Sequence, residues 1–120
     1  MRIKFVLPYP PTVNTYWRRR GSTYFVSKTG ERYRRDVALI VRQQRLKLSL
    51  SGRLAIKIIA EPSDKRRCDL DNILKAPLDA LTHAGLLIDD EQFDEINIVR
   101  GQPVSGGRLE IRITEVGVHE

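Results

Sequence analysis

The chain opens with an alternation of apolar and other side chains. Over residues 2–7, Ile3, Phe5 and Leu7 occupy every second position, a period of two that predicts a half-buried β-strand. Prolines follow at positions 8, 10 and 11, and proline lacks a backbone donor and restricts the chain. We therefore expect residues 8–21 to form a loop, and residues 22–26 to form a second short strand.

Two stretches with apolar residues every three or four positions predict the main helices. We expect Thr29 to cap the first helix, whose other face carries arginines, and Asp69 to open the second. Gly85 is well placed for a left-handed C-terminal cap. Pro77 lies within the second pattern, so we expect a kink or a break there. The apolar positions are Tyr33, Val37, Ile40, Val41 and Leu48 in the first helix, and Leu70, Ile73, Leu74, Leu78 and Leu81 in the second.

Three further stretches predict strands. Residues 54–60 are largely apolar at both alternating sets of positions, which is typical of a central strand. Residues 96–98 and 109–113 read as two more strands, and the glycine-rich connection at 101–107 favours an antiparallel hairpin. The predicted order is ββαβαββ, in one α+β domain spanning residues 1–120, with a mixed β-sheet covered by two main helices.

Composition excludes some classes of protein. The longest aliphatic run, residues 37–41, is far shorter than the ~20 residues of a membrane span. The amino-terminal segment reaches Pro8 before any signal-peptide apolar region develops. Cys68 is the single cysteine, so no internal disulfide can form. We expect a cytoplasmic protein with no membrane partner.

The net charge of +6 conceals an uneven distribution. Residues 1–68 contain 17 basic and 4 acidic side chains, a net +13, whereas residues 69–120 contain 4 and 11, a net −7. Such a basic excess favours a polyanion, with nucleic acid as the leading partner. A solvated surface that serves solubility is the alternative for any one cluster. The basic clusters are Arg18, Arg19 and Arg20; Arg32, Arg34 and Arg35; and Lys65, Arg66 and Arg67.

Acidic residues follow the last of these clusters. Asp69 and Asp71 come directly after it, and ordinary helix capping is one explanation of that pair. Asp89, Asp90 and Glu91 lie beyond the second helix. A helix of this length spans ~20 Å, and the extended segment behind it covers about the same distance. A third carboxylate can therefore return to the first two.

Converging carboxylates without histidine or thiolate form a hard-oxygen environment suited to Mg²⁺, with Mn²⁺ as a substitute. A metal held there favours phosphodiester hydrolysis. Lys75 lies four residues after Asp71. It can form a surface ion pair with that aspartate or stabilise charge that develops on a phosphate.

The run Arg66-Arg67-Cys68-Asp69-Leu70-Asp71-Asn72-Ile73-Leu74-Lys75, with the later Asp79-Ala80-Leu81 and Asp89-Asp90, resembles the RusA family of Holliday-junction resolvases. The amino-terminal Leu7-Pro8-Tyr9-Pro10-Pro11 and the carboxy-terminal Gly106-Gly107-Arg108-Leu109-Glu110 extend the resemblance to nearly the whole chain.

The resemblance implies a homodimeric, Mg²⁺-dependent endonuclease of bacterial or prophage origin that nicks two opposed strands of a four-way DNA junction. No small-molecule cofactor is implied. The family's catalytic positions fall on Asp69, Asp71, Lys75 and Asp90, and the three aspartates are the expected metal ligands. Pro77 and Cys68 depart from the residues expected at their positions.

For DNA binding we select Arg18, Arg19, Arg20, Arg66, Arg67 and Tyr16. Tyr16 and Trp17 can stack on unpaired bases or anchor a loop against the core. Two functions compete with junction resolution. One is a basic nucleic-acid-binding protein without catalysis, and the other is a metal-dependent nuclease with different structural selectivity.

Overall fold

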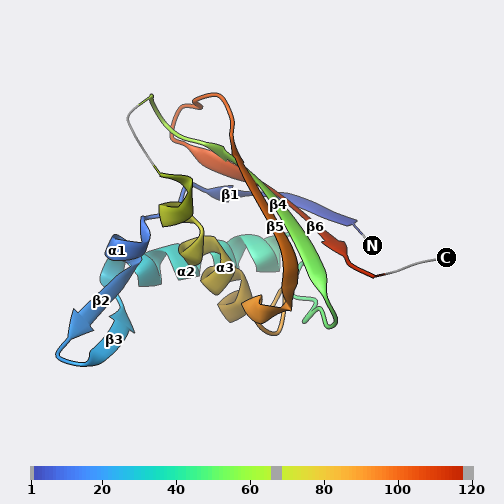
Figure 1. The fold of residues 1–120 in the computed structure, drawn as a ribbon, viewed down its shortest axis with the longest axis horizontal. Coiled ribbons are helices and arrows are strands. Elements are labelled where there is room, and N and C mark those ends of the chain that lie inside the picture. The colour runs from blue at the N-terminus through green and yellow to red at the C-terminus, as the bar shows by residue number, and fades with distance from the viewer. Residues whose placement is uncertain (1, 66–68, 118–120) are drawn as a thin grey trace.

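The four long strands form one mixed sheet in the order β1-β6-β4-β5 (Figure 1). The central strand β4 pairs antiparallel with β6 and parallel with β5, and β1 pairs antiparallel with β6. The computed structural model describes residues 2–65 and 69–117. The strands are β1 (Arg2–Pro8), β4 (Leu54–Glu61), β5 (Phe93–Arg100) and β6 (Arg108–Glu115).

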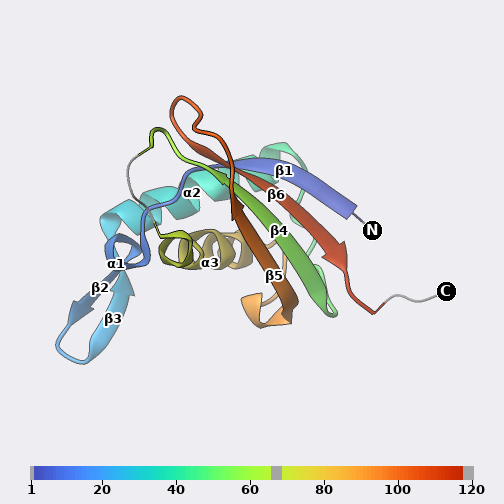
Figure 2. The same cartoon turned by 45° about the horizontal axis from the view of Figure 1, so that its top comes forward.

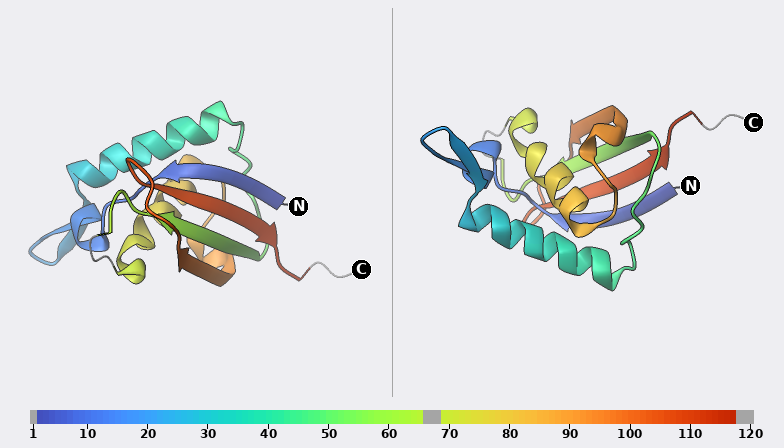
Figure 3. Two further views of the ribbon diagram at one scale, coloured as in Figure 1. Left: turned by 90° about the horizontal axis from the view of Figure 1, so that it is seen from above. Right: turned by 90° about the horizontal axis from the view of Figure 1, so that it is seen from below.

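Helices α2 (Lys28–Gln43) and α3 (Lys75–Ala84) cover the same face of this sheet (Figure 3). Alternate side chains of β1, β4 and β6 point toward the helices, because successive residues of a strand face opposite sides. The core is therefore the layer between sheet and helices. It includes Phe5, Leu7, Tyr33, Val37, Val41, Leu54, Ile56, Ile58, Leu81, Leu109, Ile111 and Ile113.

The first main helix begins earlier and ends earlier than the pattern predicts. Ser27 caps α2, since its hydroxyl accepts a hydrogen bond from the Gly30 amide at 3.0 Å. Thr29 lies inside the first turn, so its assignment as the cap is wrong. The helix ends at Gln43, and Leu48 belongs to the following loop.

The second helical stretch is divided in two. A 3₁₀-helix, η1 (Leu70–Ile73), precedes α3, and the chain changes conformation at Leu74. The expected break therefore lies before Pro77, which occupies the first turn of α3. Proline is tolerated there because an amide in the first turn has no helical acceptor. The predicted cap at Gly85 is confirmed, with φ of 91°.

The predicted loop at residues 8–21 contains regular structure. It includes α1 (Val13–Tyr16) and β2 (Trp17–Arg20), and β2 pairs antiparallel with β3 (Thr23–Val26). This β2–β3 hairpin projects away from the sheet and the two main helices (Figures 1 and 2). The loop interpretation is wrong for β2. Its arginine run forms a strand because it pairs with β3, and the run itself has no alternation of apolar and polar residues that would predict a strand.

The strands β5 and β6 do not pair with each other. They run in opposite directions, as the predicted hairpin requires, but β4 lies between them. The connection between them is long enough to cross one strand, and the two backbone edges of β4 pair with both neighbours. The α+β class, with a mixed sheet and two main helices, is confirmed. In the part of the chain that the structure describes, no helix is long and apolar enough to cross a membrane.

Candidate functional site

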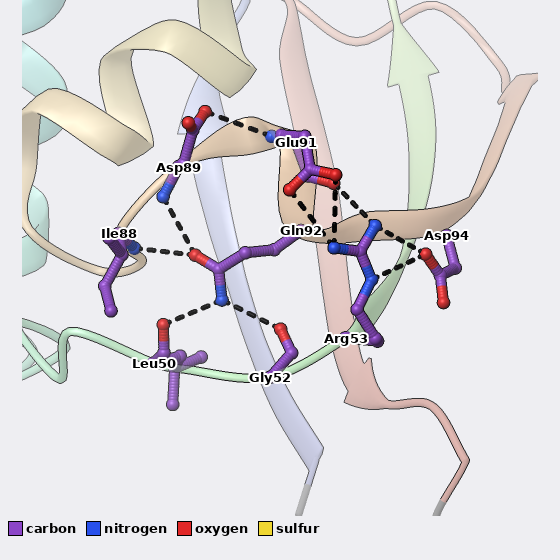
Figure 4. Close-up of polar contacts among 8 residues, drawn as sticks. All are labelled: Leu50, Gly52, Arg53, Ile88, Asp89, Glu91, Gln92 and Asp94. Atoms are coloured by element: carbon purple, nitrogen blue, oxygen red, sulfur yellow. Dashed lines mark hydrogen bonds and ion pairs between the residues drawn. The ribbon is translucent and has the colours of Figure 1, made fainter.

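A buried glutamine holds the acidic turn that follows α3. The turn is a short 3₁₀-helix, η2 (Asp90–Gln92), and Gln92 is only 7% exposed. Its side-chain oxygen accepts hydrogen bonds of 2.8 Å from the amides of Ile88 and Asp89. Its side-chain nitrogen donates bonds of 2.9 Å to the carbonyls of Leu50 and Gly52 (Figure 4). One side chain therefore ties the acidic turn to the loop before β4.

Arg53 joins the same two segments on the surface. Its guanidinium donates to the Asp94 carboxylate at 2.7 Å and to the backbone carbonyl of Glu91 at 2.7 Å. It also lies 3.1 Å from the Glu91 carboxylate (Figure 4). The acidic turn is thus fixed by a buried neutral side chain and an exposed charged one.

Asp90 and Lys75 meet at this turn. The Lys75 Nζ lies 3.6 Å from Asp90 Oδ2, and the Asp90 side chain is 30% exposed. Partial burial, and next the hydrogen bond with the neighbouring Asp89 carboxyl, raise the pKa of Asp90. The backbone amide of Glu91, as the largest cause, lowers the pKa of Asp89. The fold therefore concentrates negative charge beside Lys75.

The other two predicted carboxylates lie at η1. Asp69 stands at the position before this 3₁₀-helix without capping its backbone, and Asp71 is exposed in its first turn. A helical i,i+4 pair between Asp71 and Lys75 requires a continuous helix, which ends at Leu74 here. Lys75 pairs with Asp90 instead. Among residues 2–65 and 69–117, no three acidic, histidine or cysteine side chains gather closely enough to hold a metal ion.

A groove joins Lys75 to the β2–β3 hairpin. It has a volume of about 570 Å³. Arg18, Arg19 and Arg20 are all exposed on the hairpin, and the first two line the groove. Arg66 and Arg67 lie outside the described residues. The lining residues are Val13, Asn14, Trp17, Arg18, Arg19, Tyr24 and Lys75.

Tyr16 is a correction among the predicted DNA-binding residues. Its side chain is fully buried, so its ring has no surface on which a base could stack. Its hydroxyl donates to the Asp79 carboxylate and accepts from Arg34 Nε at 3.0 Å. Burial, and next the bond to Asp79, raise the pKa of Tyr16. The alternative, in which this aromatic residue anchors the loop to the core, is the one that fits.

Arg34 and Asp79 complete this anchor. Arg34 Nη2 lies 2.7 Å from Asp79 Oδ2, which connects α2 to α3, and the two side chains are 23% and 21% exposed. One arginine of the second basic cluster therefore points inward. We name Tyr16, Arg34 and Asp79 the anchor triad.

Sequence reasoning assigned no role to Gln92, Arg53, Tyr24 or the Arg34–Asp79 pair. Gln92 comes three residues after Asp89, a spacing typical of a capping box, and the structure contains that box. This local signal could have found Gln92. The other contacts join residues distant in sequence, and no local pattern marks them.

Carboxylates beside a lysine, at one end of a basic groove, indicate a protein that acts on phosphodiesters. One family model matches most of the chain. The family model described as endodeoxyribonuclease RusA matches residues 8–114. The chain therefore belongs to the endodeoxyribonuclease RusA family, and the resemblance inferred from the sequence is confirmed.

Similar proteins come from phages and bacteria. The chain is 59% identical over 113 residues to a phage HK97 protein named crossover junction endodeoxyribonuclease rusA, and the match covers 94% of each chain. Proteins of the same name in Escherichia coli K12 and Enterobacteria phage 82 are 42% and 41% identical over 111 residues. Both of these matches cover 92% of each chain.

Proposed function

We propose that this protein is a structure-specific endonuclease that resolves four-way DNA junctions by paired nicks in opposed strands. The observation that carries the proposal is the ion pair between Lys75 and Asp90, because Lys75 also lines the groove that Arg18 and Arg19 line. The arginines bind phosphates by charge, and the pair lies where the backbone would pass. Family membership and the names of the relatives support the same activity, in the bacterial cytoplasm where such DNA occurs.

The catalytic set that we propose is Asp69, Asp71, Lys75 and Asp90. Lys75 would stabilise the charge that develops on the phosphate in the transition state. Its contact with Asp90 keeps the ammonium at the site. Because Asp90 lies on a turn fixed by Gln92, its carboxylate is held in place before DNA arrives.

Magnesium is the cofactor that we propose, with Mn²⁺ as a substitute. Asp69, Asp71 and Asp90 would supply carboxylate oxygens, the hard ligands that this ion prefers. Among the described residues these side chains do not gather around one point, so binding of the ion would draw η1 and η2 together. Partial burial, and next the hydrogen bond with the Asp89 carboxyl, raise the pKa of Asp90, and a bound cation would favour its ionised form. When bound, such an ion polarises a phosphoryl oxygen and lowers the pKa of bound water. The proposal rests on this donor chemistry.

We also propose a homodimer. A four-way junction must be cut on two strands, whereas one chain carries one acidic site, and a twofold dimer places two sites symmetrically. The helices cover only one face of the four-stranded sheet (Figure 3). Val6 and Val99 are 46% and 40% exposed on outer strands of that sheet. Sedimentation equilibrium at micromolar concentration should give twice the chain mass, and a protein that stays monomeric with and without junction DNA would refute the dimer.

The deciding experiment is cleavage of a synthetic four-way junction with and without Mg²⁺. Wild-type protein should cleave only with the ion, and Asp71→Asn should lose cleavage while it still binds the junction. Binding without cleavage in the wild type would favour the non-catalytic alternative. Equal cleavage of duplex, fork or RNA substrates would favour a nuclease of other selectivity.

A further inference from the structure

The groove between the β2–β3 hairpin and Lys75 combines aromatic and basic side chains. Trp17 and Tyr24 line it together with Arg18, Arg19 and Lys75. Tyr24 is 65% exposed. The volume of about 570 Å³ lies in the range of pockets that take small ligands or single nucleotides.

The aromatic residues and the cations lie close together. The Arg19 guanidinium carbon is 5.6 Å from the centre of the Tyr24 ring, so the cation and the ring form one surface. Trp17 contacts the buried Tyr16 ring edge-on, with centroids 5.6 Å apart. The anchor triad therefore fixes the Trp17 side of the groove, while Tyr24 contacts Arg19 and is largely exposed to solvent.

From this juxtaposition we propose that the groove binds one unstacked nucleobase of the DNA junction, with its flanking phosphates on Arg18 and Arg19. The proposal rests on the proposed function and adds the group that this site recognises beside the cleaved strand. Paired bases within a duplex are covered by their neighbours, whereas a branch point offers bases whose faces can be exposed. Aromatic side chains flanked by arginines are the usual surface for such bases.

Charge argues against the alternative occupant, a second copy of this hairpin. Two copies would bring their arginine runs together, because Arg18, Arg19 and Arg20 are all exposed. Like charges brought together in a partly desolvated groove repel each other. A nucleotide instead supplies negative charge for the arginines and a flat base that can stack on the aromatic rings of the groove.

Trp17 gives a direct measurement, because it is the single tryptophan of the chain. We would follow its fluorescence while wild-type protein binds a four-way junction in EDTA, where binding is measured without cleavage. The second substrate is the same junction with abasic sites at the branch point. We expect strong quenching with the intact junction and little quenching with the abasic one at equal saturation. Equal quenching by the two would overturn the proposal.

Two variants of neighbouring residues sharpen the test. Tyr24→Ala removes the exposed wall of the groove, whereas Phe25→Ala changes the next residue, which is 41% exposed and does not line the groove. Base–aromatic stacking contributes about 1–3 kcal/mol, so Tyr24→Ala should raise the Kd for the intact junction about fivefold or more. Phe25→Ala should match the wild type.

The same preparations separate this inference from the function on which it rests. Junction cleavage in Mg²⁺, together with unchanged Trp17 fluorescence on binding, would overturn the nucleobase site alone. Absence of junction cleavage by the wild type would overturn the proposed function. A Tyr24→Ala protein that binds intact and abasic junctions with wild-type affinities would also overturn the nucleobase site.

Discussion

Two regions meet at Lys75, and they are built in opposite ways. The acidic turn η2 is tied to the loop before β4 by two hydrogen bonds that Gln92 donates and by Arg53, and Gln92 accepts two more within the turn. The β2–β3 hairpin projects from the body and leaves Tyr24 and its arginines exposed (Figure 2). We infer that this difference reflects function, because reacting groups need fixed positions, whereas a surface that binds DNA has to adjust to its shape.

The hairpin is nevertheless fixed at its base. The anchor triad connects α1, which leads directly into β2, to both main helices. The direction in which the hairpin leaves the body is therefore set by contacts with the core.

The largest effect is expected for Asp90→Asn. If Asp90 binds the metal, its removal should reduce cleavage by about 10³-fold or more, because a metal ligand contributes several kcal/mol to the transition state. Junction affinity should stay equal or rise, since a negative charge near the phosphates is removed. Single-turnover cleavage and a binding titration in EDTA measure the two quantities. An equal loss of binding and cleavage would contradict the assignment.

We also expect Asp90→Asn to change the pH dependence of the free energy of unfolding. The folded protein holds the Asp90 proton more tightly than an ordinary carboxyl does, so ionisation of Asp90 opposes folding. The free energy of unfolding therefore falls as pH rises between the ordinary pKa of 3.8 and the raised value. Asp90→Asn should be at least as stable as the wild type at pH 7, and this difference should vanish below about pH 4. Denaturant unfolding at both pH values tests the sign.

The next largest effect is expected for Gln92→Ala. The variant leaves two amides and two carbonyls without their partner, which should cost about 2–4 kcal/mol of stability. Cleavage should fall about 10- to 100-fold beyond any change in folded fraction, because the turn that carries Asp90 is released. Gln102→Ala, at an exposed glutamine in the connection after β5, is the control. If the Gln92→Ala protein were less stable but cleaved at the wild-type rate, the position of the turn would not matter for catalysis.

Local patterns in the sequence predicted one of these two regions better than the other. Chain lengths alone allowed one of the later carboxylates to return to Asp69 and Asp71. The structure pairs Asp90 with Lys75, and within the described residues no three such side chains gather. Strand β2 was not predicted, because three consecutive arginines have no alternation and become a strand only through pairing with β3. The position of β5 failed for a similar reason. The order of strands in a sheet depends on which strands lie side by side, and the residue pattern within one strand does not predict its neighbours.

A smaller effect on stability is expected from Asp79→Asn. The variant weakens the bonds that Asp79 accepts from Tyr16 and Arg34 and leaves a partly buried guanidinium without its counter-ion. We expect a loss of about 1–3 kcal/mol and faster hydrogen exchange in β2 and β3, with little change at the acidic turn. Asp36→Asn, at an exposed aspartate of α2, is the control. Uniform acceleration across the whole chain would mean that the triad supports the core rather than the hairpin.

The smallest effect is expected for single changes in the hairpin arginines, and it is the most informative about how the hairpin works. Arg18→Gln, Arg19→Gln and Arg20→Gln should each weaken junction binding by a few fold. Each lost phosphate contact should reduce the slope of log affinity against log salt by ~1, while the cleavage rate of the bound junction stays unchanged. Arg42→Gln, near the opposite end of α2, is the matched control because it removes the same charge from a distant site. If the salt slope were unchanged in all three hairpin variants but reduced in Arg35→Gln, the residues that contact the phosphates would lie on α2. A cleavage rate that fell along with the slope would mean that the hairpin helps to position the reacting strand, so the division between a fixed catalytic region and an adjustable binding region would no longer hold.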